Sequence, residues 1–442
     1  MRIRLLLSLV LVAALVAPSL HAWQQPAPQA PAAPAAGAAP AAAGRGGGRG
    51  GGAVKSPEIA ADGRVTFRLR APNAKTVAAT VGGNNLAMQR DEQGLWSVTS
   101  SAFAPGIYTY SLVVDGTSIN DPNNRQVQTS FTGFQSMFVV PGAEPWLPAA
   151  NVPKGTIARH RFHSTIANDD RDFYVYTPAG YDVRRSKAYP VLYLLHGLGD
   201  DAERWINGGG ANNILDNMIA QGKAVPMVVV TTLGYGTSEG PSGNSGEIVT
   251  GYAKILLSEV MPQVQKSYHV SANREERAIA GLSMGGAEAL FTGLNNLDRF
   301  AWLGSFSGAF VMWPRPTAAA APGAPPVAAP PPPAPPSAVA GAPEAAGAAG
   351  RGGRGGRGGG AALDPSVFEK NFPTLDAKAN SRIKYMVIAC GTADGLLGVN
   401  RQFKEWLKTK NVQFTDVEVP DQGHVWPLWR QNLTDFVQKA FK

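Results

Sequence analysis

The residue best suited to do chemistry is a serine between glycines. Ser283 lies in RAIAGLSMGGAEAL, where an apolar run gives way to a helix-like run within the pattern Gly-x-Ser-x-Gly. A serine on a sharp turn between a buried strand and a helix exposes its Oγ as a nucleophile. Ser238 occupies a second match to the pattern, but the PSGNSG that follows it soon after cannot start a helix. We therefore read Ser238 as part of a loop and predict that Ser283 is the nucleophile.

Chain order restricts the general base and its partner acid. A serine hydroxyl needs a base, and after an elbow of this kind the acid and then the histidine follow the serine in the chain. Of the six histidines, only His424 follows Ser283. Asp394, just beyond the apolar run YMVIAC, is the predicted acid that orients the imidazole. Asp421 is the alternative, although an acid so close in sequence to His424 seldom reaches the imidazole at a suitable angle.

Acyl transfer also needs two backbone donors aimed at the oxygen that becomes negatively charged. The N–H of Met284, the residue after the nucleophile, is the first candidate. The second is expected from HGLG, which follows the apolar run YPVLYLL, through Gly197 or Leu198. His196 precedes the serine in the chain, so we interpret it as a structural residue that fixes this loop.

The apolar patterns predict two folded parts. Residues 56–145 contain short alternating segments such as VTFRLRA, TVAATV and IYTYSLVVDG, which are typical of a small antiparallel, immunoglobulin-like β-sandwich. Residues 146–442 alternate apolar strands such as YPVLYLL and PMVVV with amphipathic helices, which indicates a mostly parallel sheet covered on both faces. In such α/β sheets, sites gather at the carboxyl ends of the strands.

Three other segments have compositions unsuited to a packed core. Residues 1–22 read as an export signal whose apolar run is too short to span a bilayer. Residues 23–55 are an Ala/Pro/Gly-rich linker, and residues 315–362 are a similar insertion that we expect to form a disordered surface loop. The mature chain is therefore expected in the periplasm or outside the cell, with no membrane span.

The formal net charge of +8 does not indicate a nucleic-acid partner. Seven arginines lie in the signal or in glycine-rich tracts, where Glu344 is the one acid, and without these eight residues the charge is +2. The folded parts are thus close to neutral. Cys390 is the one cysteine, which excludes an intramolecular disulfide and a thiolate-rich metal site. No metal-ligand spacing such as H-E-x-x-H occurs in the sequence, so we expect no metal or other cofactor.

The motifs LLHGLGDDAERW, REERAIAGLSMGGAEAL and DQGHVWPLWRQNLTDF closely resemble the esterase-D-like hydrolases of carbohydrate esterase family 1. That family includes feruloyl and acetyl-xylan esterases, with enterochelin-esterase-like proteins as near relatives. The resemblance runs from about Gly155 to the C-terminus, and the insertion at 315–362 departs from it. Residues 56–145 resemble the early-set β-sandwich related to family-48 carbohydrate-binding modules.

The resemblance implies an α/β-hydrolase fold without a metal cofactor. By this resemblance, the residues at the family's catalytic-triad positions are Ser283, Asp394 and His424. The residues at the family's oxyanion-hole positions are Gly197 and Met284. The function it implies is a secreted or periplasmic serine esterase that removes feruloyl or acetyl groups from fragments of plant polysaccharide such as xylan. The alternatives are a siderophore or small-molecule ester hydrolase and, from another class, a polysaccharide-binding protein with a catalytically dead hydrolase domain.

Aromatic residues near the motifs are candidate contacts for a sugar or a feruloyl ring, although aromatics serve equally well in a core. In the second part of the chain these candidates are Trp205, Tyr235, Trp426 and Trp429. In the sandwich, Trp96, Tyr108 and Tyr110 have the same ambiguity. Strand alternation puts Tyr108 and Tyr110 on one face, so at most that face is a candidate sugar platform, and the favoured interpretation is a sandwich that only packs against the catalytic domain.

Overall fold

The computed structural model describes residues 54–315 and 363–442. The predicted signal peptide (1–22), almost all of the predicted linker and almost all of the predicted insertion lie outside the described residues. All of the described residues fall within one compact unit of the chain. In the part of the chain that is described, no helix has the length and apolar character needed to cross a membrane.

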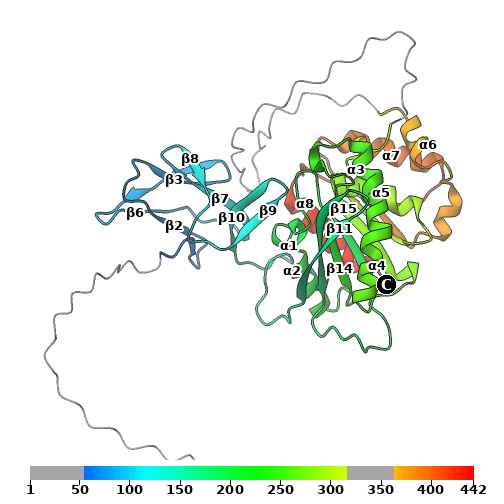
Figure 1. Ribbon diagram of the computed structural model, residues 1–442, viewed down its shortest axis with the longest axis horizontal. Helices are drawn as coiled ribbons and strands as arrows, with labels where there is room; N and C mark the ends of the chain where they lie inside the picture. The colour runs from blue at the N-terminus through cyan, green and yellow to red at the C-terminus, as the bar shows by residue number, and fades with distance from the viewer. Residues whose placement is uncertain (1–53, 316–362) are drawn as a thin grey trace, which may run out of the picture. The chain divides into compact units, whose positions relative to one another are not determined.

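The first folded part is built from two antiparallel sheets, drawn in blue to cyan in Figure 1. One has the strand order β1-β2-β6-β5, and the other has the order β4-β3-β7-β10-β9 with β8 paired to β7. The strands are β1 (Glu58–Ile59), β2 (Val65–Arg70), β3 (Val77–Val81), β4 (Asn84–Ala87), β5 (Gln89–Arg90), β6 (Leu95–Thr99), β7 (Gly106–Val114), β8 (Thr117–Ile119), β9 (Val127–Ser130) and β10 (Gly133–Val140).

Alternating side chains of the two sheets share one hydrophobic core. Val65, Phe67 and Leu69 of β2 point into this core, together with Phe138 of β10. The ring of Phe138 contacts the rings of Phe67, Phe103, Tyr108 and Tyr110, at centroid distances from 5.2 to 5.8 Å. This arrangement is consistent with the predicted β-sandwich.

The candidate sugar platform is not present on β7. Tyr108 and Tyr110 do share a face of β7, but it is the core face, where they are 6% and 0% exposed. Trp96 is buried in the same core, and its indole N–H donates to the carbonyl oxygen of Ala71. The two-residue period of a β-strand predicts which side chains share a face, but it does not predict whether that face is buried or exposed to solvent.

The second folded part is organised around one long sheet with the order β11-β12-β14-β13-β15-β16-β17-β18. The hairpin β11–β12 and its pairing with β14 are antiparallel, and every pairing from β14 to β18 is parallel. The predicted mostly parallel sheet is therefore confirmed. Its strands are β11 (Thr156–Ser164), β12 (Asp169–Thr177), β13 (Val191–Leu195), β14 (Val228–Thr232), β15 (Arg277–Leu282), β16 (Trp302–Phe306), β17 (Tyr385–Gly391) and β18 (Thr415–Val419).

Helices cover both faces of this sheet (Figure 1). One hydrophobic cluster packs α3, α5 and α7 against one face, and a second packs α2 and α8 against the other. The α-helices are α1 (Arg204–Asn207), α2 (Ala211–Ala220), α3 (Ser245–Ile255), α4 (Met261–Ser267), α5 (Met284–Asn295), α6 (Ser366–Asn371), α7 (Leu397–Thr409) and α8 (Trp426–Lys439). A π-helical turn, η2 (Leu256–Val260), joins α3 to α4, and short 3₁₀ turns occur at η1 (Gly240–Ser242), η3 (Arg274–Glu276), η4 (Phe310–Met312) and η5 (Ala377–Ser381).

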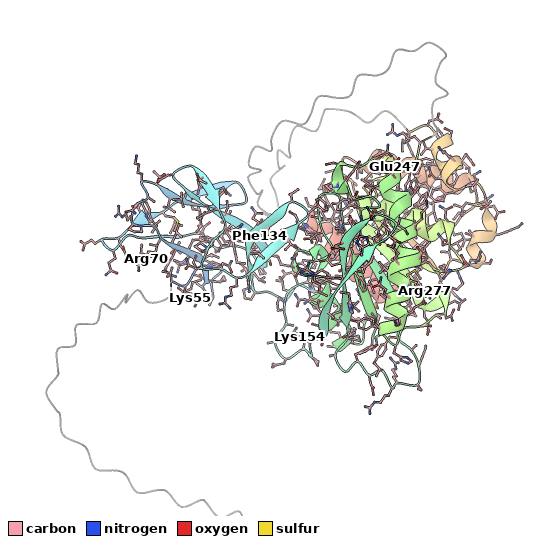
Figure 2. The ribbon with its side chains drawn as sticks, in the orientation of Figure 1. Lys55, Arg70, Phe134, Lys154, Glu247 and Arg277 are labelled. Atoms are coloured by element: carbon pink, nitrogen blue, oxygen red, sulfur yellow. The ribbon has the colours of Figure 1, made fainter. Side chains whose placement is uncertain are left out.

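Truncation of Phe138 tests the sandwich core. Phe138 is fully buried, so Phe138→Ala is expected to lower the free energy of unfolding of this part by about 3–5 kcal/mol. Phe134, on the same strand and labelled in Figure 2, is 60% exposed, so Phe134→Ala is the matched control with an expected change within about 0.5 kcal/mol. Urea denaturation followed by tryptophan fluorescence measures both, and equal effects would contradict the two-sheet core.

Candidate active site

Ser283 occupies a strained turn between β15 and α5. Its backbone has φ 52° and ψ −116°, a region that residues other than glycine rarely adopt. The Ser283 N–H donates to the carbonyl oxygen of Phe306 at 2.9 Å, which ties the turn to the neighbouring strand β16. A Cβ added at Gly281 would lie 2.4 Å from the carbonyl oxygen of Gly285, so the flanking glycine is required by space. The predicted strand, turn and helix are confirmed.

The parallel strands bring the other candidate residues to the same edge of the sheet. Because β15 pairs with β13 and β16, and β17 with β16 and β18, the carboxyl ends of these five strands are adjacent. The oxyanion loop, residues 196–200, follows β13, and Ser283 follows β15. Asp394 follows β17, and His424 lies between β18 and α8. Segments that are far apart in sequence therefore meet where α/β sheets carry their sites.

Asp394 and His424 form a close pair. The Asp394 Oδ2 lies 2.9 Å from the Nδ1 of His424, with the carboxylate side chain fully buried and the imidazole 37% exposed. Burial favours a raised pKa for Asp394, but the bond to His424 and its charge, with donors at Leu396 and Ser307, outweigh burial and lower the pKa below 3.8. An ionised acid can hold the imidazole in one orientation and stabilise its protonated form.

Asp421, the alternative acid, is not bonded to the imidazole of His424 among the described residues. It lies on the exposed surface with φ 57°, and its backbone N–H donates to the Thr392 Oγ1 at 2.9 Å. No hydrogen bond joins its carboxylate to His424 among the described residues. Nor does a direct hydrogen bond join Ser283 to His424 there, a contact that in such sites often tightens only when substrate is bound.

Ser307 is a polar residue of this site that the sequence analysis missed. It follows β16 with φ 52°, and its buried hydroxyl accepts the indole N–H of Trp429 at 3.1 Å. The hydroxyl also helps to lower the pKa of Asp394. The ring of Trp429 in turn meets the His424 imidazole edge to face, with centroids 4.7 Å apart. Trp429 and Ser307 thus brace both members of the Asp394–His424 pair.

A sequence signal for Ser307 did exist. It follows the apolar run WLGSF in the same way that Ser283 follows RAIAGL, and both runs predict buried strands. Polar residues at the carboxyl ends of neighbouring parallel strands are drawn to the same edge, so each such residue was a candidate.

The oxyanion loop lies against the nucleophile. A Cβ added at Gly197 would be 2.7 Å from the Leu282 Cδ1 and 3.5 Å from the Ser283 Cβ. Among the described residues, the backbone N–H groups of Gly197, Leu198 and Met284 have no acceptor, whereas that of Gly199 donates to the Tyr235 hydroxyl. The three amides named from the sequence are therefore the ones left with their N–H groups unused.

His196 is a structural residue of this loop. It is fully buried, and burial lowers its pKa and favours the neutral imidazole. Its Nε2 accepts the N–H of Gly234 at 2.8 Å, so the proton sits on Nδ1, which lies 2.7 Å from the carbonyl oxygen of Gly197. Both nitrogens are thus engaged in the loop, in agreement with the sequence interpretation.

Three of the four aromatic residues that were candidate substrate contacts are core residues. Trp205 and Tyr235 are fully buried and Trp429 is nearly so, which leaves little ring surface for a ligand. The indole N–H of Trp205 donates to the carbonyl oxygen of Leu195, so this ring supports the end of β13. Trp426 is half-buried, and the guanidinium group of Arg204 covers one side of its ring at 5.2 Å. Trp426 alone of the four retains ring surface open to solvent.

Glu288 lies beneath the site as a buried acid. It is one turn into α5, it is fully buried, and neither carboxylate oxygen has a hydrogen-bond partner among the described residues. Burial raises its pKa well above 4.5, and the nearby charge of Arg171 opposes this only in part. A Cβ added at Gly234 would lie 3.0 Å from its Oε2, which places Glu288 next to the residue that donates to His196.

Cys390 lies on β17, close to the site but without a role in it. It is fully buried, and burial together with the charge of Asp394 raises the pKa of the thiol to about 12. Across residues 54–315 and 363–442, no group of His, Cys, Asp and Glu side chains is arranged to hold a metal ion.

The sequence of residues 164–334 matches the family described as "Putative esterase". The curated protein "Endo-1,4-beta-xylanase/feruloyl esterase" of Xylanibacter ruminicola is 32% identical over 266 residues, which cover 58% of this chain and 36% of that protein. The chain thus spans little more than a third of that relative's length. A xylanase of Acetivibrio thermocellus, "Endo-1,4-beta-xylanase Y", is 30% identical over 158 residues, which cover 33% of this chain and 14% of the relative.

Among solved structures, the enterobactin esterase of Shigella flexneri aligns with a TM-score of 0.52 at 18% identity, over 86% of this chain and 93% of that one. A ferulic acid esterase of Anaeromyces mucronatus aligns with a TM-score of 0.47 at 21% identity, over 68% of this chain and 96% of that one. The first alignment shows a shared α/β-hydrolase fold.

Ser307 can be tested as a positioning residue. The hydrogen bond that Ser307 accepts from Trp429 contributes about 0.5–1.5 kcal/mol, so Ser307→Ala is expected to lower kcat on any ester substrate by up to about tenfold and leave KM unchanged. Ser305, two residues earlier, is fully buried with an unpartnered hydroxyl, so Ser305→Ala is the matched control and should keep kcat. Steady-state kinetics, with thermal melts to verify folding, decide between them. Equal kcat for the two variants would contradict this role for Ser307.

The burial of Glu288 predicts how the free energy of unfolding depends on pH. The folded protein holds Glu288 protonated, whereas the unfolded chain releases that proton above about pH 4.5. Wild-type stability therefore falls by up to about 1.4 kcal/mol per pH unit above that value, until the raised folded pKa is reached. Glu288→Gln removes this loss, so its free energy of unfolding relative to wild type should rise between pH 5 and pH 8 in urea denaturation. A constant difference would mean that Glu288 is ionised in the folded state.

Proposed function

We propose that this chain hydrolyses carboxylic esters through an acyl-enzyme formed on Ser283. The observation that carries the proposal is the meeting of a strained serine turn, the Asp394–His424 pair at 2.9 Å and unused backbone N–H groups at one edge of the sheet. The match of residues 164–334 to an esterase family supports the same reaction.

In the first half of the reaction, His424 acts through its Nε2. The Nδ1 faces Asp394, which leaves the other ring nitrogen to take the proton from the Ser283 Oγ. The Oγ then attacks the ester carbonyl carbon, and the carbonyl oxygen becomes an oxyanion. The N–H groups of Met284 and of Gly197 or Leu198 stabilise this charge, and they need no rearrangement to do so.

In the second half, the tetrahedral intermediate collapses. The C–O bond to the alcohol breaks, His424 returns its proton to the leaving oxygen, and the acyl group stays on Ser283. Water then gives a proton to His424 and attacks the acyl carbonyl, and a second collapse releases the acid and restores the Ser283 hydroxyl. The charge of Asp394 stabilises the imidazolium in both halves.

For the substrate, we propose feruloyl or acetyl esters on fragments of plant polysaccharide. Support comes from the relative named as a xylanase and feruloyl esterase, which is 32% identical over 266 residues. An export signal at residues 1–22 would fit such a substrate, because plant polysaccharide does not enter the cytoplasm. We therefore also propose that the mature chain works in the periplasm or outside the cell.

The decisive experiment replaces the nucleophile. Ser283→Ala is expected to lower turnover by about 10⁶. Ser238 is exposed and occupies the second Gly-x-Ser-x-Gly match, so Ser238→Ala is the matched control and should leave turnover unchanged. The mature protein is assayed on p-nitrophenyl acetate, methyl ferulate, acetylated xylan and a tri-catecholate siderophore ester.

The outcomes separate the candidate functions. Ser283-dependent turnover that favours methyl ferulate or acetylated xylan supports the proposal in full. Preference for the siderophore ester would keep the reaction and replace the substrate. A Ser283→Ala variant that retains more than about one thousandth of wild-type activity would contradict the mechanism. A wild-type protein that binds glycan and turns over none of the esters would make this a binding protein with an inactive hydrolase domain.

A further inference from the structure

The oxyanion loop is anchored from inside its own domain at Gly199. This glycine has φ 88°, and its N–H donates to the Tyr235 hydroxyl at 2.7 Å. The same hydroxyl donates to the carbonyl oxygen of Asp200 at 3.0 Å. Tyr235 therefore fixes the second half of the loop through its backbone, two residues from the amide of Gly197 that is proposed to hold the oxyanion.

The other backbone group of Gly199 is bound by a residue of the β-sandwich. The N–H of Phe131, in the two-residue turn between β9 and β10, donates to the carbonyl oxygen of Gly199 at 3.0 Å. The Phe131 ring meets the Tyr235 ring nearly at right angles, with centroids 5.0 Å apart. The N–H of Gly199 is thus bound by Tyr235, and its carbonyl oxygen is bound by Phe131 of the sandwich.

Two further contacts fix this turn. The Phe131 ring lies directly on Gly240, where an added Cβ would be 2.3 Å from the Phe131 Cζ. On β9, the Thr129 Oγ1 accepts the side-chain amide N–H of Asn207, at the end of α1, at 3.0 Å. Gly240 belongs to the Gly-x-Ser-x-Gly match that does not carry the nucleophile, so its glycine serves as the seat for this ring.

The geometry points to Phe131 as a positioning residue for the proposed reaction: the β9–β10 turn of the sandwich holds the oxyanion loop in its working conformation through the backbone of Gly199. This inference rests on the proposed esterase function. It means that the sandwich contributes to stabilisation of the oxyanion during hydrolysis of every ester, including esters that carry no sugar. A loop fixed at both backbone groups of Gly199 keeps its free amides preorganised, which is what oxyanion stabilisation requires.

The bond can be removed while the turn is kept. Proline is favoured at the first central position of type I and II turns, and neither Phe131 nor Thr132 has a positive φ, so Phe131→Pro suits this turn and eliminates the N–H donor. Phe131→Ala removes the ring and keeps the donor. On p-nitrophenyl acetate, Phe131→Pro is expected to lower kcat about tenfold with KM unchanged, which is part of the 10²–10³ lost with a whole oxyanion donor. Phe131→Ala is expected to show a smaller loss in kcat.

The matched control is Phe134→Ala, which removes an exposed aromatic ring from the same hairpin and should keep wild-type kcat. Wild-type kcat in a folded Phe131→Pro protein overturns the inference. A raised KM with unchanged kcat overturns it as well, because Phe131 would then be a substrate contact.

Two precautions keep the result decisive. If thermal melts show that Phe131→Pro does not fold, the double variant Thr129→Val/Phe131→Ala loosens the same turn, and it must lower kcat more than either single change. Failure of the proposed function looks different, because wild type and Phe134→Ala would then both lack turnover that depends on Ser283. That result would remove this inference together with the function.

Discussion

The site depends on one backbone conformation, the positive φ of Ser283. A side chain in this region strains the chain, so the surroundings must hold it there. They do so through the bond from the Ser283 N–H to β16 and through the close approach of Gly281 to Gly285, where any larger residue would collide with backbone. The turn therefore needs β15 in the middle of the sheet, with a strand on each side, and α5 packed directly behind it. The position of β15 in the strand order satisfies that need.

The same sheet explains how a site is assembled from distant parts of the chain. From Gly197 to His424 the residues come from loops after successive parallel strands, and the sheet brings those loops together without any local sequence relation. Several polar groups around the site are bound from more than one element. Ser307 accepts a bond from Trp429 of α8 and helps to lower the pKa of Asp394, and Gly199 is bound by both Tyr235 and the sandwich. Such shared contacts keep the reacting groups in place before substrate arrives.

Much of this followed from the sequence, because order and periodicity are local properties. The run before Ser283 predicted the strand, the glycines predicted the turn, and the required order singled out His424. The parallel sheet and the two-sheet sandwich likewise followed from patterns of apolar residues. The orientation of Tyr108 and Tyr110 did not follow, because alternation groups residues on one face and cannot say which face is buried.

Other features could not be predicted because they depend on contacts across the fold. Trp205 and Tyr235 flank the motifs in sequence, yet they are core residues. Trp205 supports the end of β13, and Tyr235 supports the backbone of the oxyanion loop. The burial of Glu288 also depends on the fold, because α5 packs directly behind the nucleophile. The bond from Phe131 to Gly199 joins two folded parts, and no pattern within either part contains it.

The state of Cys390 has a practical consequence for work on this protein. The chain has one thiol, and it is buried in the sheet with its pKa raised to about 12, so the reactive thiolate is scarce at neutral pH. A cysteine introduced on the surface would then be the one site that maleimide reagents modify. Fluorophores or spin labels could be attached to the β9–β10 turn and to the oxyanion loop, one label at a time, without first removing the natural cysteine.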